Sequence, residues 1–302
     1  MGAAFVTGAD GFVGRHLTMA LGERPIVAPP RSALELLDAE AVAAAVADAA
    51  PATVFHLAAQ ASVGHSWEAP GEVIHENIQT TLNVLEAVRR SAPDATVVVA
   101  SSGEIYGPPA RLPVDEDAPL RPQNPYAVSK AACDLLARQY ADAHGLGVVC
   151  VRAFNQAGPG QSSDYVVGTI AHQIAEAERR RDSEAVVETG NPDSRRDFVD
   201  VRDAALAYVA AAGAPPGAYN VCSGEAVSVR DLVRMAADAA RVPVRHEVRS
   251  DRVRSHDVPE VRGSAAKLAG ETGWRPSIPL AQTIADAIEA LRSEIGAGYP
   301  AS

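Results

Sequence analysis

The chain has 302 residues and a mass of 31.4 kDa, enough for one large domain or two interlocked ones with a sizeable core. Hydrophobic residues make up 47% and charged residues 22%, which argues against a disordered chain. Lys and Arg number 27 against 38 Asp and Glu, so the net charge is −11. This sign of charge disfavours nucleic acid and anionic lipid as partners, and an anionic ligand must therefore be bound by local arginines.

The sequence shows no targeting or metal-binding signal. No stretch approaches the ~18–20 apolar residues of a membrane span, and the first residues lack the pattern of a signal peptide. Cys133, Cys150 and Cys222 lie far apart among small apolar residues and form no CxxC pair. We therefore expect buried, reduced thiols in a cytoplasmic protein with no metal site.

Short β-branched runs alternate with helical patterns through the first half of the chain. Near-continuous apolar strands separated by helices predict a parallel sheet covered on both faces, which is an α/β fold. The expected strands are 4–7, 53–57, 96–101 and 147–151, and the long helices are 73–90 and 126–143.

The pattern changes after Asn155. Gly158-Pro159-Gly160 interrupts it, a charged helix ending at Arg181 follows, and the later strands are short, at 186–188 and 219–221. A helix at 200–212 resembles the sheet-covering helices of the first half, and residues 280–295 predict an amphipathic closing helix. These features indicate a smaller α+β lobe that is woven with the first.

A glycine-rich loop directly follows the first expected strand. Gly8 permits a tight turn, Gly11 permits close approach of a pyrophosphate, and Gly14 permits the following helix to pack on the strand. Phe12 and Val13 open that helix, whose N-terminal amides favour negative charge. The loop therefore predicts a dinucleotide site.

The end of the second strand indicates which dinucleotide is bound. An acidic residue there would bind the ribose 2′-hydroxyl of NAD, but segment 26–32 has no acid and instead has Arg31 and Ser32. A guanidinium and a hydroxyl suit a 2′-phosphate, so NADP(H) is expected over NAD(H). The alternative is a solvated surface arginine.

A second motif lies at the start of the 126–143 helix. Asn124 is a plausible N-cap, Pro125 suits the first helical position, and Tyr126 and Lys130 share a face one turn apart. A nearby ammonium is expected to lower the tyrosine pKa, so that Tyr126 can exchange a proton with a carbonyl or carbinol oxygen. Ser102 closes the preceding strand and could place a hydroxyl beside that oxygen.

The order of glycine loop, strand-end serine and YxxxK resembles the short-chain dehydrogenase/reductase superfamily, and more narrowly its extended branch that acts on nucleotide-sugars. The likeness runs over nearly the whole chain, in TGADGFVG at 7–14, FHLAAQASV at 55–63, Asn77, SSGEIYG at 101–107, PYAVSK at 125–130, RAFNQAGPGQ at 152–161, RRDFVDVRD at 195–203 and YNVCSG at 219–224.

The resemblance implies a role for each matching residue. Tyr126 would be the catalytic acid/base, Lys130 would hold the nicotinamide ribose, and Ser102 would bond to the reacting oxygen. The resemblance places Leu57, Ala58 and Ala59 along the cofactor, and Asn155 and Arg196 on the substrate diphosphate.

Two of these positions, and His56 beside them, have structural interpretations. Arg196 could pair with Asp193, Asp197 or Asp200, and Asn155 could form a turn before Gly158. His56, in an apolar strand, is expected to be a core histidine.

The resemblance also implies a division of the chain. The expected fold is a Rossmann-type doubly wound parallel sheet with a smaller α+β substrate lobe. Residues 1–158 and 197–221 would form the dinucleotide-binding domain, and residues 159–196 and 222–302 the nucleotide-sugar lobe. Relatives dimerise through two helices that match 73–90 and 126–143, so a homodimer is expected.

The loop after the fourth strand separates the candidate reactions. In 4,6-dehydratases a polar residue follows the Ser/Thr and precedes a Glu that removes the C5 proton, whereas this chain has Gly103 and then Glu104. Gly103 has no side chain to deliver a proton, which weakens a dehydratase. It would contact the substrate instead, and Glu104 would be the base, a sugar-hydroxyl contact or a structural carboxylate.

Four stretches look most like GDP-4-dehydro-6-deoxy-D-mannose reductases, which form GDP-D-rhamnose: RAFNQAGPGQSS, GNPDSRRDFVDVRD, YNVCSGEAVSVRDL and DVPEVRGSAAKLAGETGW. The chain departs from them at Gln156, where His is common, and at Arg254-Ser255, where Arg-Pro is common. Arg254 is still expected to meet the diphosphate. The expected activity is NADPH-dependent 4-keto reduction of a GDP-linked sugar, and the alternatives are a dehydratase, a 4-epimerase and a non-catalytic NADP-binding regulator.

Overall fold

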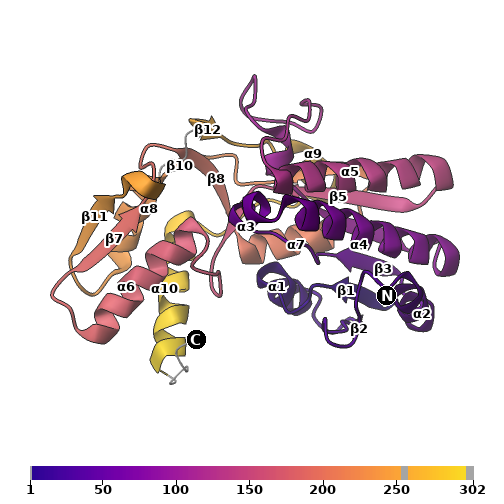
Figure 1. Cartoon of the computed structure of the whole chain (residues 1–302), viewed down its shortest axis with the longest axis horizontal. Helices are drawn as coiled ribbons and strands as arrows, with labels where there is room; N and C mark the ends of the chain where they lie inside the picture. The colour runs from indigo at the N-terminus through magenta and orange to yellow at the C-terminus, as the bar shows by residue number, and fades with distance from the viewer. Residues whose placement is uncertain (1, 253–257, 297–302) are drawn as a thin grey trace.

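The computed structural model describes residues 2–252 and 258–296 and has a larger half built on one parallel sheet (Figure 1). Its strand order is β2-β1-β3-β4-β5-β9, and every pairing is parallel. The strands are β1 (Ala4–Thr7), β2 (Ile26–Val27), β3 (Thr53–His56), β4 (Thr96–Ser102), β5 (Gly147–Ala153) and β9 (Gly217–Val221). The chain reverses its winding direction between β1 and β3, the point at which open α/β sheets bind ligands.

Helices cover both faces of this sheet, as the apolar strands require. One face packs against α1 (Phe12–Ala20), α7 (Val201–Ala211) and α9 (Ala266–Thr272), through a core that includes Leu17 and Leu268. The other face packs against α2 (Ala39–Ala49), α4 (Pro70–Ser91) and α5 (Pro125–His144), through a core that includes Val46 and Val88. The expected Rossmann-type doubly wound sheet is confirmed.

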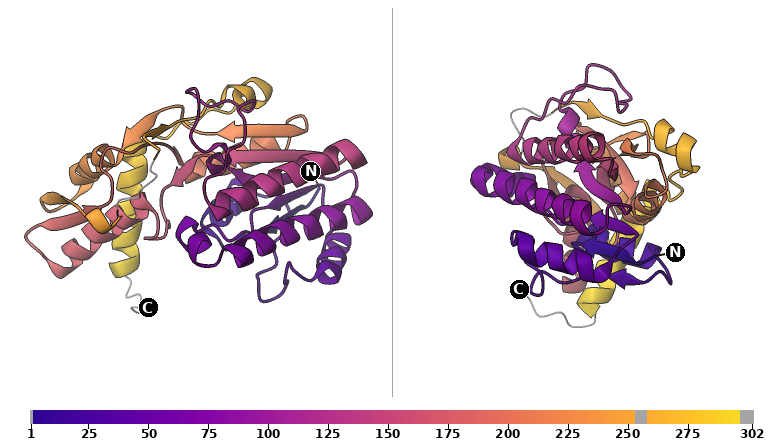
Figure 2. Two further views of the ribbon diagram at one scale, coloured as in Figure 1. Left: turned by 45° about the horizontal axis from the view of Figure 1, so that its top comes forward. Right: turned by 90° about the vertical axis from the view of Figure 1, so that its right-hand side faces the viewer.

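The smaller half has its own core and lies beside the carboxyl ends of the large sheet (Figure 2). A mixed sheet joins β8 (Arg195–Asp200) to β6 (Asn155–Ala157), β10 (Ala226–Ser228) and β12 (Glu260–Val261). A two-stranded sheet pairs β7 (Ala185–Thr189) with β11 (Val244–Val248). The remaining elements are α3 (Val63–Glu68), the 3₁₀ turns η1 (Gly103–Tyr106) and η2 (Ser250–Arg252), α6 (Val166–Arg180), α8 (Val229–Ala239) and α10 (Leu280–Gly296).

The expected elements of the first half are found within a few residues of their expected bounds. The helix expected at 73–90 starts at Pro70, and the one expected at 126–143 runs from Pro125 to His144. The expected domain division stays a prediction, and β8 lies across its boundary at residue 197. Among the described helices, none is long and apolar enough to cross a membrane.

Two predictions about buried polar residues are confirmed. Cys133, Cys150 and Cys222 are free and buried. His56 is a core histidine, because Nδ1 and Nε2 of its ring lie 2.8 and 3.2 Å from the hydroxyls of Thr7 and Thr81. Burial, followed by the charge of Lys130, lowers the pKa of His56 from 6.5 to about 3.

Candidate active site

The glycine loop leaves no room for side chains at two of its predicted positions. Gly8 has φ of +74°, and a Cβ on it would lie 2.7 Å from the Ala58 amide nitrogen. A Cβ on Gly14 would lie 2.1 Å from the Gly8 carbonyl oxygen. Gly11 caps α1 without a side-chain hydrogen bond, so the first amides of α1, from Phe12 and Val13 onward, are available to an anion. The loop fits a dinucleotide pyrophosphate.

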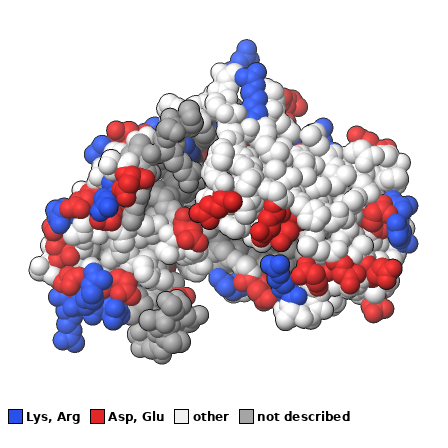
Figure 3. All heavy atoms as spheres, viewed as in Figure 1, with Lys and Arg blue, Asp and Glu red and all other residues white. Residues whose placement is uncertain are grey.

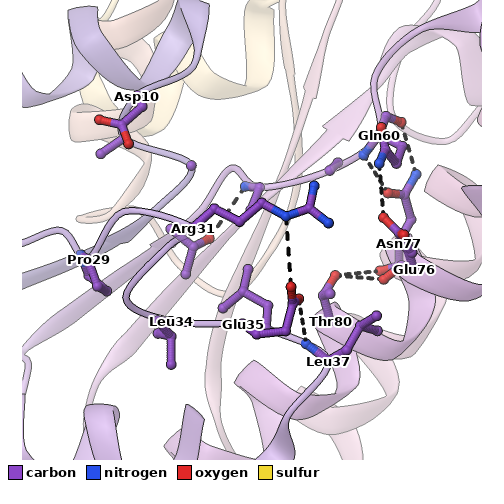
Figure 4. Close-up of a pocket in the computed structure, with 16 residues that line it drawn as sticks. Asp10, Pro29, Arg31, Leu34, Glu35, Leu37, Gln60, Glu76, Asn77 and Thr80 are labelled. Atoms are coloured by element: carbon purple, nitrogen blue, oxygen red, sulfur yellow. Dashed lines mark hydrogen bonds and ion pairs between the residues drawn. The ribbon is translucent and has the colours of Figure 1, made fainter. Parts of the chain in front are cut away.

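A cavity of about 250 Å³ lies next to this loop, at the carboxyl ends of β1 and β3 (Figure 4). Four predicted cofactor residues line it, namely Gly8, Arg31, Ala58 and Ala59. Leu57 instead packs against the core on the α1 side of the sheet. The cavity is also lined by residues for which the sequence predicted no role, namely Thr7, Ala9, Asp10, Pro29, Leu34, Glu35, Leu36, Leu37, Gln60, Glu76, Asn77 and Thr80.

Arg31 is the one cation among the described residues that line the cavity. Its Nε lies 3.8 Å from a carboxylate oxygen of Glu35, and 74% of its side chain is exposed (Figure 4). An exposed pair at this distance is weak. The guanidinium is therefore free to exchange Glu35 for a stronger anionic partner.

Asn77 connects the loop that follows β3, at Gln60, to the helix that carries Tyr126. Its Oδ1 accepts from the Gln60 amide at 2.8 Å, and its Nδ2 donates to the Gln60 carbonyl at 3.1 Å and to Ser129 Oγ at 2.9 Å. Ser129 in turn donates to the Tyr126 carbonyl at 2.7 Å. The sequence indicated only that Asn77 lies inside the helix expected at 73–90, as part of the resemblance, and gave no sign of this link.

Three predicted catalytic residues lie on two elements that pack against each other. Ser102 is the last residue of β4 and is 7% exposed. Tyr126 is the second residue of α5, which Asn124 caps by accepting from the Ala127 amide at 2.7 Å. Lys130 follows one turn later, buried, and its Nζ donates to the Ala100 carbonyl at 2.7 Å. The hydrogen bond from Lys130 to Ala100 ties α5 to β4.

The expected lowering of the Tyr126 pKa by Lys130 is not found. Burial raises the pKa of Tyr126 above its ordinary value, and the charges of Tyr165 and Glu104 add to that rise. A hydrogen bond with Ser102 acts in the opposite direction. Burial also lowers the pKa of Lys130. The raised pKa of Tyr126 favours its phenol form, which is the form that can donate a proton.

In the loop after β4, Gly103 is buried whereas the neighbouring Glu104 is exposed. Gly103 is buried, and a Cβ on it would lie 3.1 Å from the Phe154 ring. Glu104 is exposed, and its carboxylate accepts from Asn124 Nδ2 at 3.3 Å. The small residue is thus needed for packing, whereas the carboxylate lies beside the start of α5.

The predicted diphosphate residues lie on the neighbouring strands β6 and β8. Asn155 Nδ2 donates to the Asp197 carbonyl at 3.0 Å. Arg196 donates to the carbonyls of Arg195 at 2.9 Å and Val258 at 2.7 Å. Arg254, the third predicted diphosphate residue, lies outside the described residues.

Asp197 is a buried residue that sequence analysis considered only as a partner for Arg196. Its carboxylate accepts from the amides of Ser223 at 2.7 Å, Gly224 at 2.9 Å and Gly263 at 3.1 Å, and from the Ser223 hydroxyl at 2.7 Å. Burial raises the pKa of Asp197, and these hydrogen bonds oppose the rise. The side chain clamps β8 to the segments that follow β9 and β12.

Charged side chains do not form a broad basic area on the face shown in Figure 3, among the residues described there. Acidic and basic residues are interspersed over both halves. Many are paired, such as Arg245 with Glu184 and Arg292 with Glu178. Among the described residues, no three His, Cys, Asp or Glu side chains gather as metal ligands.

Known proteins resemble the chain over nearly its whole length. A "GDP-6-deoxy-D-mannose reductase" of Pseudomonas aeruginosa is 36% identical, over 93% of this chain and 94% of that protein. The structure of RMD from Pseudomonas aeruginosa complexed with NADPH has a TM-score of 0.86 and 33% identity, covering 97% of this chain and 100% of that one. Thermus thermophilus UDP-glucose 4-epimerase in complex with NAD has a TM-score of 0.84 and 30% identity, with 96% and 99% covered.

Fold, site and relatives together define an extended short-chain dehydrogenase/reductase, an NAD(P)-dependent enzyme that modifies nucleotide-sugars. Within that class the chain belongs to the family described as GDP-mannose 4,6 dehydratase, whose profile matches residues 32–287.

Proposed function

We propose that the protein reduces the 4-keto group of a nucleotide-linked 4-keto-6-deoxyhexose with NADPH, and that the substrate is GDP-4-dehydro-6-deoxy-D-mannose and the product GDP-D-rhamnose. The observation that carries the proposal is the geometry of Ser102 at the end of β4 and Tyr126 at the start of α5, because these two elements pack together and reduction of a ketone needs an acid and a hydrogen-bond donor at the oxygen. The likeness to the Pseudomonas reductase supports the GDP-linked deoxysugar.

The chain's own residues would act on the carbonyl oxygen. Bound NADPH supplies the hydride that converts the C4 ketone into an alkoxide. Tyr126 donates its proton to the oxygen as the negative charge develops, and the Ser102 hydroxyl donates a hydrogen bond to the same atom. Asn155, Arg196 and Arg254 would bind the remote diphosphate and so position the carbonyl.

Glu104 and Gly103 support reduction over dehydration. Glu104 is exposed, and its carboxylate accepts a hydrogen bond from Asn124 Nδ2, so it is engaged at the start of α5. At Gly103 a side chain would meet the Phe154 ring, so the position cannot hold a proton donor for a departing 6-hydroxyl without repacking. The alternatives remain a dehydratase, a 4-epimerase and a non-catalytic NADP-binding regulator.

Arg31 supports NADPH over NADH as the reductant. Arg31 lines the cavity formed by the loops that follow β1 and β3. A 2′-phosphate bound there would replace Glu35 as the partner of its guanidinium. Comparable affinity for NADPH and NADH would contradict this preference.

The test of the proposed reaction uses two reactions in parallel. One contains the protein, NADPH and GDP-4-dehydro-6-deoxymannose, and the other contains GDP-mannose with NADP⁺. We expect NADPH oxidation in the first and no keto-sugar in the second. A keto-sugar in the second identifies a dehydratase with Glu104 as its base. Turnover of a sugar-nucleotide without net NADPH consumption identifies an epimerase, and cofactor binding without any turnover identifies the regulator.

We propose that the protein is a homodimer through α4 and α5. Val128 and Leu135 lie seven residues apart on one face of α5 and are 41% and 54% exposed, and Trp67 of the adjacent α3 is 64% exposed. Light scattering should give the mass of a dimer, and Leu135→Glu should give a monomer, whereas Leu206→Glu on α7 should leave the dimer intact. A monomeric wild type would refute the assignment.

We propose that the protein is located in the cytoplasm, because its buried free thiols agree with a reducing compartment.

A further inference from the structure

The Asn124 side chain makes two hydrogen bonds in different directions. Its Oδ1 caps α5 by accepting from the Ala127 amide at 2.7 Å, and its Nδ2 donates to Glu104 Oε2 at 3.3 Å. The cap determines the orientation of the amide, because a reversed side chain would set Nδ2 against the Ala127 N–H. The donor end of Asn124 is therefore directed at the Glu104 carboxylate.

Glu104 is held at both its main chain and its side chain. Its amide donates to Ser102 Oγ at 3.1 Å, while its carboxylate is bound by Asn124 at the start of the helix that carries Tyr126. The other residues of η1 are buried, so Glu104 is the one side chain of that turn that reaches solvent. The carboxylate is thus fixed between the elements that carry the catalytic serine and tyrosine.

One oxygen of this carboxylate, Oε1, has no partner among residues 2–252 and 258–296. Among the described residues, no hydrogen bond or ion pair reaches Glu104 Oε1. Ser102 and Glu104 both act on Tyr126, the first through a hydrogen bond and the second through its charge, so the carboxylate lies near the two groups expected to act on the carbonyl.

The charge of Glu104 selects what can lie beside it. A carboxylate repels the diphosphate of a nucleotide-sugar, so this side of the site suits the uncharged sugar. A carboxylate is also an acceptor only, and the donors on a hexose are its hydroxyls. The Glu104 amide bonds to Ser102 Oγ, so a sugar whose carbonyl faced Ser102 would bring the hydroxyl of an adjacent carbon closest to Glu104.

We propose that Asn124 is a positioning residue that holds Glu104 so that its second carboxylate oxygen accepts a hydrogen bond from a sugar hydroxyl adjacent to the reacting carbonyl. This inference rests on the proposed function and narrows its substrate class to sugars with a free hydroxyl at C3. Glu104 is then a substrate-binding carboxylate and not a base in this enzyme.

The first test is a double-mutant cycle on Asn124 and Glu104. Asn124→Ser keeps an N-cap acceptor and removes the donor to Glu104, and Glu104→Ala removes the carboxylate. We expect each to lower kcat/KM for the keto-sugar nucleotide about 10-fold, mainly through KM, as loss of a charged hydrogen bond predicts. We expect an unchanged Tm and NADPH affinity, and no further loss in the double variant.

Gln123→Ser is the matched control, because among the described residues its side chain bonds only to the carbonyls of Arg121 and Pro122, just before the same helix start. It should behave as wild type. Wild-type kinetics for Asn124→Ser, or a double variant whose loss is the product of the two single losses, would overturn the positioning role.

The second test changes the substrate. Wild type should use a 3-deoxy analogue of the keto-sugar nucleotide about 10-fold less efficiently than the parent, whereas Glu104→Ala should use both alike. Equal discrimination by the two proteins would overturn the hydroxyl contact. Deuterium incorporation at C5 in D₂O that depends on Glu104 would make the residue a base and would also overturn it.

Failure of this inference can be told apart from failure of the proposed reaction. If wild type oxidises no NADPH, the proposed reduction fails, and the same cycle is then measured as the Kd of GDP-mannose by calorimetry. Coupling between Asn124 and Glu104 in that Kd would support the positioning role independently of reduction, and independent losses would refute it.

Discussion

The glycine loop after β1 and the clamp around Asp197 both hold segments that carry predicted binding residues, but they depend on different parts of the chain. The glycine loop is built from eight consecutive residues, and its geometry depends on the absence of side chains at Gly8 and Gly14. The clamp joins β8 to residues 26 to 66 positions further along the chain. One region is therefore specified by local backbone sterics, and the other by burial of one charge among distant donors.

The two regions therefore differ in how readily they can be recognised from the sequence. A position that has no room for a Cβ can be recognised in the sequence, because only glycine lacks this atom. A buried aspartate is visible only when its donors are known, because the same residue on the surface of a strand would be an ordinary solvated charge. The predictions that follow test the two regions and the catalytic group between them.

The largest expected effect is on the catalytic group. Tyr126→Phe removes the proton donor and should reduce turnover about 1,000-fold, because general acid catalysis contributes 10²–10⁴-fold. Circular dichroism and NADPH affinity should stay at wild-type values. Turnover within a few-fold of wild type would show that another group supplies the proton.

The clamp is tested by Asp197→Asn. The introduced amide would place N–H donors against the amides that Asp197 now accepts from, and we expect a loss of about 2–4 kcal/mol in the free energy of unfolding. Urea titration gives the value. Asp193→Asn is the matched control, because Asp193 is 76% exposed and pairs with an exposed Arg230, so its loss should stay below about 0.5 kcal/mol. Equal losses would contradict the role of burial.

The glycine loop is tested by Gly14→Ala. The new Cβ would overlap the Gly8 carbonyl, so the loop must shift, and we expect NADPH affinity to fall about 100-fold by fluorescence titration. Gly71→Ala in α4 is the control, since nothing lies within 4 Å of its added Cβ. An unchanged affinity in Gly14→Ala would show that the loop does not hold the cofactor.

The preference for NADPH over NADH is expected to give a smaller effect, and it is tested at Arg31 in the cavity next to the glycine loop. Arg31→Gln should weaken NADPH binding about 10-fold and leave NADH binding unchanged, because only NADPH carries the 2′-phosphate. Parallel titrations with the two dinucleotides measure the ratio. An equal loss for both would place Arg31 outside the 2′-phosphate site.

A separate effect, outside both regions, is a pH dependence of stability that originates at His56. Its pKa is about 3 in the folded protein and 6.5 in the unfolded chain, because burial disfavours the charged ring. Its contribution is complete above pH 6.5 and is lost as the pH falls from 6.5 toward 3, by up to about 1.4 kcal/mol per pH unit.

Unfolding curves between pH 7.5 and 5 measure this slope. His56→Gln should flatten it, whereas His75→Gln, which changes an exposed side chain of α4, should keep the wild-type slope. An unchanged slope in His56→Gln would assign the acid sensitivity to other groups.

The parallel sheet could be predicted, and candidate catalytic residues could be placed on it, because these signals are local. Apolar β-branched runs and helical spacing gave strands and helices close to those observed, and Asn124-Pro125 marked the start of α5. Relative position in the chain then identified Ser102, Tyr126 and Lys130. These residues lie at the carboxyl ends or adjoining helix starts of a parallel sheet, where such sheets bind ligands.

Tertiary structure decided the features that depend on burial and on contacts between distant segments. Local spacing predicted that Lys130 would lower the Tyr126 pKa, but burial of the phenol dominates and raises it. Asn77 and Asp197 became positioning residues only when the fold brought Gln60, Ser129, Ser223 and Gly263 to them. The sequence by itself determined the backbone shape and the reactive groups, because sterics and periodicity act over a few residues. Their electrostatic state was decided by the fold, because desolvation depends on everything packed around a group.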